Sequence, residues 1–69
     1  MEMYSDIQMV EYLFRKYYKV LRAYSFRFVN DWHAAENIVQ DIFFELWCRR
    51  ESIDFTQGIK TYLFKSVYN

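Results

Sequence analysis

Apolar residues recur at alternating spacings of three and four along the first part of the chain. The recurring positions are Ile7, Val10, Phe14, Tyr17, Leu21, Tyr24 and Phe28. Such spacing places side chains on one face of a helix, and neither Gly nor Pro interrupts the run. Ser5 and Gln8 fit a capping box, in which side chains accept hydrogen bonds from backbone N–H groups at the helix start. We predict helical structure over residues 6–29, as one long or slightly kinked helix or as two abutting helices.

The apolar stripe of this segment is compatible with two kinds of packing. A heptad-like seam is typical of a coiled-coil dimer. Leu13, Val20 and Val29 lie off the seam and widen the stripe, and a wide stripe is typical of a helix packed within a bundle. We favour the bundle, and the dimer is the alternative.

A polar break separates the first segment from a second amphipathic one. Asn30 can end a helix and Asp31 can cap the next one. We predict a second helix from about residue 32 to about residue 50, with Arg49 and Arg50 in its last turn, where cations interact favourably with the negative end of the helix dipole. Its predicted inner face consists of Ala35, Ile38, Val39, Ile42, Phe43, Leu46 and Trp47.

The remaining residues predict a loop and one more helix. "ESIDFTQG", residues 51–58, is the loop, and the last helix is predicted to begin at Gln57 or Gly58. Its apolar stripe is Ile59, Leu63 and Val67. The chain has no Pro and one Gly, whereas hairpins and sandwiches need frequent turn residues. The expected fold class is all-α, a compact bundle of three to four helices in one domain, residues 1–69. The last helix lacks a basic last turn and a following Gly, so we expect a fragment of a longer chain.

Size and composition bear on the core of the chain and on its location in the cell. A chain of 69 residues buries only about 60% of its unfolded surface, and its aromatic residues, 23% of the sequence, supply heavy core side chains. The single Cys48 cannot form an internal disulfide, and the N-terminal residues do not resemble a secretion signal. No apolar stretch approaches the roughly 18 residues of a membrane span. We expect a cytoplasmic protein with no membrane span.

Candidate catalytic chemistry is sparse. His33 is the only His, and Cys48 lies about four turns away along the same predicted helix, so a Cys–His pair is out of reach. His33 and Glu36 have a spacing that can hold a metal, but no second pair completes a site. No Gly-rich phosphate loop is present. We predict that the protein is not an enzyme and has no metal site and no cofactor. The remaining class of function is binding to a partner.

Charge is zero overall but uneven along the chain. Residues 1–30 carry a net +2, residues 31–54 a net −4 and residues 55–69 a net +2. One side of the acidic middle helix is lined by Glu36, Asn37, Gln40, Asp41, Phe44 and Glu45. Acids and amides can receive Arg side chains, and Phe44 can anchor in an apolar pocket of a partner. The alternative is an ordinary solvated face with one stray aromatic, and the residues alone leave both open.

The last helix combines cations, hydroxyls and rings. One band holds Thr61, Tyr62, Lys65, Ser66 and Asn69, and the next holds Lys60, Phe64 and Tyr68. Lys side chains can neutralise phosphates, and aromatic rings stack on unpaired bases at about 1–3 kcal/mol per base. This combination suits single-stranded or partly opened nucleic acid. The competing interpretation is that the rings belong to the core.

Three motifs in order resemble a known family. They are "LFRKYYKVL" (residues 13–21), "AENIVQDIF" (residues 35–43) followed by Leu46-Trp47, and "IKTYLFKSVYN" (residues 59–69). Together they resemble region 2 of bacterial sigma-70-family factors of the extracytoplasmic-function type. The resemblance covers almost the whole chain and implies a role in transcription initiation.

The resemblance implies two partner surfaces. The middle helix would dock on the coiled-coil clamp helices of the largest subunit of core RNA polymerase. The polymerase-binding residues would be Glu36, Asn37, Gln40, Asp41 and, at the edge, Phe44. The last helix and its loop would recognise and melt the promoter −10 element and trap a flipped base of the non-template strand. The DNA-binding residues would be Phe55, Thr56, Gln57, Lys60, Thr61, Tyr62, Lys65, Ser66 and Asn69.

Departures from the family pattern make the middle helix less negative and the last helix less positive than is usual in the family. Ala34 and Asn37 stand where the family often has acids, and Tyr68 stands where it often has Arg. We expect the family's second DNA-binding domain, which reads the −35 element, to lie outside these 69 residues. An anti-sigma factor is a further possible partner that would cover both surfaces. The alternative function is a helical protein–protein interaction domain that does not touch DNA.

Overall fold

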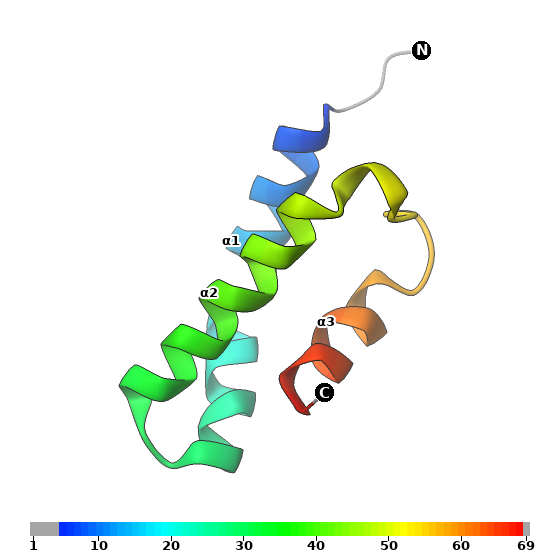
Figure 1. The fold of residues 1–69 in the computed structure, drawn as a ribbon. Helices are drawn as coiled ribbons and strands as arrows, with labels where there is room; N and C mark the ends of the chain where they lie inside the picture. The colour runs from blue at the N-terminus through cyan, green and yellow to red at the C-terminus, as the bar shows by residue number, and fades with distance from the viewer. Residues whose placement is uncertain (1–4, 69) are drawn as a thin grey trace.

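The computed structural model describes residues 5–68, which form three α-helices and one short 3-10 turn. Helix α1 spans Asp6–Val29, α2 spans Trp32–Cys48, the 3-10 turn η1 spans Arg50–Ser52 and α3 spans Ile59–Tyr68. Helices α1 and α2 run antiparallel beside each other, and the chain then loops back so that α3 packs against both (Figure 1). The prediction of an all-α bundle is confirmed.

Local capping signals fix both ends of α1. The Ser5 hydroxyl accepts from the Gln8 N–H at 3.2 Å, and the Gln8 side chain accepts from the Ser5 N–H at 3.0 Å, so the capping box is formed. Asn30 takes the left-handed conformation (φ 54°) that ends many helices. The Asp31 side chain then accepts from the Ala34 N–H at 3.1 Å and caps α2. Of the two predictions for residues 6–29, the single continuous helix is confirmed.

The end of α2 differs from its prediction. The helix ends at Cys48, Arg49 is its C-cap and Arg50 lies in η1, so the predicted boundary at residue 50 is wrong. The physical reason is that Arg50 turns back onto α2 instead of continuing it. Its guanidinium lies 3.8 Å from the ring centroid of Trp47 and donates to the Trp47 carbonyl at 2.9 Å. It also lies 3.9 Å from the Asp6 carboxylate, which joins the end of α2 to the start of α1.

The core is built mainly by α2. Its buried residues are Ala35, Val39, Ile42, Phe43 and Leu46, while Ile38 and Trp47 are half-buried. Helix α1 adds Leu13, Leu21 and Ser25, and α3 adds Leu63. The predicted inner face of α2 is therefore confirmed in its main positions.

The predicted stripe of α1 is only partly correct. Leu21 of that stripe is buried and Tyr17 is half-buried against the core, but Ile7, Phe14 and Phe28 are exposed. The buried residue in the first half of α1 is Leu13 instead. An α-helix has 3.6 residues per turn, so a strict heptad pattern drifts around a helix of this length. The face of α1 that meets α2 and α3 consequently crosses the sequence seam rather than following it.

A short polar turn leads into α3. The Asp54 carboxylate accepts from the backbone N–H of Thr56 at 2.9 Å and also from its hydroxyl. These two hydrogen bonds, the hydroxyl's first, lower the pKa of the Asp54 carboxyl from its ordinary value. Gly58 has a φ of 68°, which a residue with a side chain rarely adopts, and α3 begins directly after it. The predicted stripe of α3 packs inward, with Leu63 buried and Ile59 and Val67 half-buried against the core.

Candidate functional site

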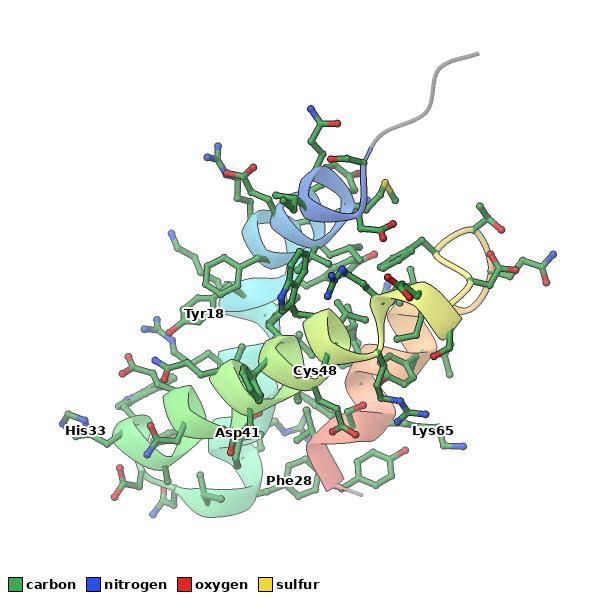
Figure 2. The ribbon with its side chains drawn as sticks, turned by 45° about the horizontal axis from the view of Figure 1, so that its top comes forward. Tyr18, Phe28, His33, Asp41, Cys48 and Lys65 are labelled. Atoms are coloured by element: carbon green, nitrogen blue, oxygen red, sulfur yellow. The ribbon has the colours of Figure 1, made fainter. Side chains whose placement is uncertain are left out.

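The polar residues of α2 project away from the core. Asn37, Gln40 and Asp41 are exposed, while Val39 and Phe43 on the opposite side of the same helix are buried. Within residues 5–68, no hydrogen bond or ion pair involves the side chains of Asn37, Gln40 or Asp41. Their amide and carboxylate groups are therefore available to a partner. Asp41 is labelled on α2 in Figure 2.

Phe44 continues this surface with an apolar side chain. It is 68% exposed, more than any other large hydrophobic residue in the described part of the chain. Phe43, the preceding residue, is buried and contacts Phe14 of α1 in an edge-to-face arrangement. The exposure of Phe44 therefore follows from the helix turning its neighbour inward, and the ring is left free to enter a pocket of a partner.

Glu36 differs from the rest of the predicted α2 set. Its carboxylate accepts from the Arg22 guanidinium of α1 at 3.2 Å, and both side chains are 35% exposed. The same guanidinium lies 5.0 Å from the Trp32 ring centroid and 6.0 Å from that of Tyr18. Glu36 is thus already engaged across the α1–α2 interface. Sequence reasoning missed Arg22, since nothing local indicates a partner fourteen residues away.

The predicted DNA-binding set divides between exposed and half-buried residues. Exposed members are Thr56, Gln57, Lys60, Thr61 and Lys65, and half-buried members are Phe55, Tyr62 and Ser66. The half-buried rings of Phe55 and Tyr62 pack against the core. Asn69, the last member, lies outside the described residues. The competing interpretation, that the rings are core residues, is therefore correct in part for Phe55 and Tyr62.

A groove of about 390 Å³ lies between the end of α2 and helix α3. It is lined by Glu45, Arg49, Tyr62, Lys65 and Ser66. Glu45 and Arg49 form an exposed ion pair at 3.3 Å on the α2 side. Exposed ion pairs of this kind contribute little to the free energy of folding. On the α3 side the Ser66 hydroxyl donates to the Tyr62 carbonyl at 2.8 Å. Arg49 was predicted only as a helix-end residue, and the groove adds it to the polar surface beside α3.

A second, shallower hollow of about 400 Å³ lies on the outer side of α3. Its lining residues are Lys60, Thr61, Phe64, Lys65 and Tyr68. Lys65 lines both hollows, so its side chain borders both sides of α3. Neither Lys60 nor Lys65 takes part in an ion pair within residues 5–68.

The residues considered for catalysis do not converge. His33 lies in the first turn of α2 and Cys48 at its last residue, and both are exposed (Figure 2). Within residues 5–68, no three His, Cys, Asp or Glu side chains gather to hold a metal ion. No helix in the same described stretch is long and apolar enough to cross a membrane.

Comparison with known protein families assigns the chain to a family. Residues 13–69 match the model of the sigma-70 region 2 family. The match includes all of α2 and α3 and most of α1, and it contains all three sequence motifs. No curated protein and no solved structure was found to match the chain. The chain therefore belongs to the sigma-70 region 2 family, whose members are non-enzymatic sigma factor domains that bind core RNA polymerase and promoter DNA in transcription initiation.

Proposed function

We propose that the chain is region 2 of a sigma factor of the extracytoplasmic-function type, working as one helical domain in the cytoplasm. In this proposal α2 docks on the coiled-coil clamp helices of the largest polymerase subunit. Helix α3 and its preceding loop recognise the promoter −10 element and trap a base from the melted non-template strand. The observation that carries the proposal is the outward projection of Asn37, Gln40, Asp41 and Phe44 from a helix whose other side is core.

The chemistry of the α2 surface favours a basic partner. Asp41 offers two carboxylate oxygens, which an Arg fork can meet with two parallel hydrogen bonds. Asn37 and Gln40 add amide groups that accept or donate, so they tolerate several partner side chains. Phe44 supplies an apolar anchor at the edge of the polar strip, which consists of Glu36, Asn37, Gln40 and Asp41. An anti-sigma factor that covers this strip would block polymerase access.

Within this strip, Asp41 has the larger expected role. Glu36 is held by Arg22 at 3.2 Å, so a polymerase cation must compete with an internal one. Asp41 has no such competitor among the described residues. We therefore assign the main charge contact to Asp41 and an edge contact to Glu36.

The chemistry of α3 favours an opened DNA strand. Residues 55–69 contain two Lys and no acid, so this end of the chain attracts phosphates. Tyr62 packs one part of its ring on the core and lines the groove beside Ser66 and Lys65. A ring held in this way offers a fixed surface to a flipped base.

Exchange of one charge tests the polymerase contact. We expect Asp41→Arg to abolish binding to core RNA polymerase, because it places a cation against a basic partner, while the far-UV circular dichroism stays unchanged. Glu51→Arg is the matched control, since Glu51 is an exposed acid in η1, away from the strip. Wild-type affinity of Asp41→Arg for core polymerase would contradict the proposed docking.

Removal of one ammonium group tests the DNA contact. A single-stranded oligonucleotide carrying a −10-like sequence should bind the complex of the chain with core polymerase in a salt-dependent manner. Lys65→Ala should weaken that binding, and its effect should shrink as salt rises. Salt-independent binding that is equal for both proteins would favour the interaction-only alternative.

A further inference from the structure

A ladder of aromatic rings crosses from α1 to α3. The ring centroids of Tyr17 and Phe64 are 6.5 Å apart, and those of Phe64 and Tyr24 are 5.2 Å apart. Tyr24 and Phe28 follow at 5.3 Å. The ladder ends at Tyr68, whose ring centroid lies 6.1 Å from that of Phe28. Phe28 lies in the last turn of α1, beside the end of α3 (Figure 2).

Burial explains the inner rings of the ladder but not the outer ones. Tyr17, Tyr24 and Phe64 are half-buried, and their rings pack against one another between α1 and α3. Phe28 is 56% exposed and Tyr68 is 57% exposed, so each leaves more than half of its surface in water. The planes of these two rings are tilted by 39°, so the rings do not cover each other face to face. Two neighbouring rings from different helices therefore form an open apolar surface beside the half-buried rings.

The surroundings of these rings are cationic. Tyr68 also lines the outer hollow of α3 together with Lys60, Lys65 and Phe64. Both Lys side chains are exposed, and no ion pair within residues 5–68 involves them. Arg27, beside Phe28 in the last turn of α1, is exposed as well. An apolar ring pair bordered by unpaired cations is complementary to a ligand that is flat and apolar in one part and anionic in another.

We propose that Phe28 and Tyr68 form a stacking platform for a second unpaired base of the bound strand. Lys60 and Lys65 contact the phosphates on either side of that base. This platform rests on the proposed function, extends it from α3 to the end of α1, and lies apart from the loop that traps the flipped base. Stacking is tolerant of base identity, so the platform holds the strand in place rather than reading its sequence.

Other occupants fit the surface less well. A helix from another protein or a second copy needs a continuous apolar face to bury, and here two rings stand among cations. Intact duplex DNA offers phosphates but hides the faces of its bases, so the rings would gain nothing. An unpaired base satisfies both the rings and the cations.

Substitutions that keep volume but remove the ring test the platform. The probe is a single-stranded −10-like oligonucleotide with 2-aminopurine at successive positions, bound to the chain in complex with core polymerase. Phe28→Leu should weaken binding about fivefold or more and should relieve 2-aminopurine quenching at one position. Phe28→Trp, which retains a ring, should keep both affinity and quenching. Tyr68→Leu should reproduce the loss and gives a second variant if one folds poorly.

The matched control is Tyr12→Leu. Tyr12 is also an aromatic residue of α1 and is 54% exposed, but it lies in the opposite half of the helix. Its variant should bind DNA like the wild type. If Phe28→Leu and Tyr68→Leu bind like the wild type while Lys65→Ala binds weakly, the platform is wrong and the proposed function stands. If Lys65→Ala also binds like the wild type, the proposed DNA contact fails too. A dimer in sedimentation that Phe28→Leu abolishes would identify a self-association surface and overturn the platform.

Discussion

Helices α2 and α3 carry the two proposed binding surfaces in different ways. Helix α2 buries five residues and supplies most of the core, so its outward side chains stand on a well-anchored helix. Helix α3 buries one residue fully, Leu63, and its remaining core contacts come from half-buried side chains. Elements with few buried apolar contacts open more easily. The comparison suggests a rigid surface for polymerase and a more adaptable one for DNA.

The largest expected effect comes from truncating one fully buried leucine in each of these two helices. Leu46 of α2 and Leu63 of α3 are both fully buried, so each change to Ala should cost about 2–5 kcal/mol of unfolding free energy. Leu46→Ala should raise amide exchange throughout the chain, because it removes part of the shared core. Leu63→Ala should raise exchange in α3 more than in α1 and α2. Hydrogen exchange with urea unfolding measures both, and identical exchange patterns would contradict the difference between the helices.

A smaller effect should separate two acids of the same surface. Asp41→Asn should reduce affinity for core polymerase about tenfold, which corresponds to loss of one charge-assisted hydrogen bond of about 1.4 kcal/mol. Glu36→Gln should reduce it about threefold or less, since Arg22 already neutralises Glu36 at 3.2 Å. Titration calorimetry at fixed salt gives the comparison. An equal or larger loss for Glu36→Gln would mean that the internal pair opens in the complex.

The smallest effect concerns the loop before α3 and depends on pH. Hydrogen bonds from Thr56 lower the pKa of Asp54 in the folded chain. The charged carboxylate therefore stabilises the turn at pH values above its ordinary pKa of 3.8, and this contribution is lost as pH falls through the lowered value. An NMR titration of the Asp54 side-chain carbon should give a midpoint below 3.8, and Thr56→Ala should raise it. A midpoint unchanged by Thr56→Ala would exclude these hydrogen bonds as the cause.

Sequence reasoning succeeded where the signal was local. The Ser5–Gln8 capping box, the turn at Asn30 and the cap at Asp31 each depend on residues close in sequence, and each is confirmed. The inner face of α2 was also predictable, because its apolar residues recur with the helical period and that side of the helix is buried.

Sequence reasoning failed where the outcome depends on distant elements. The choice between Leu13 and Phe14 as the buried residue of α1 is decided by where α2 and α3 pack. The Arg22–Glu36 pair joins two helices, and Arg50 leaves α2 to contact Trp47 and Asp6. None of these contacts follows from spacing along one helix. The assignment of individual side chains to polymerase or DNA stays a prediction.

The central claim is that α2 faces polymerase while α3 faces DNA, and photo-crosslinking tests it most directly. A benzoylphenylalanine replaces Phe44 in one variant and Thr61 in another, both exposed positions, and each is bound to core polymerase with promoter DNA. The account predicts that the Phe44 probe crosslinks to the largest polymerase subunit and the Thr61 probe to the non-template strand. Crosslinking of the Phe44 probe to DNA, or of the Thr61 probe to protein alone, would contradict it.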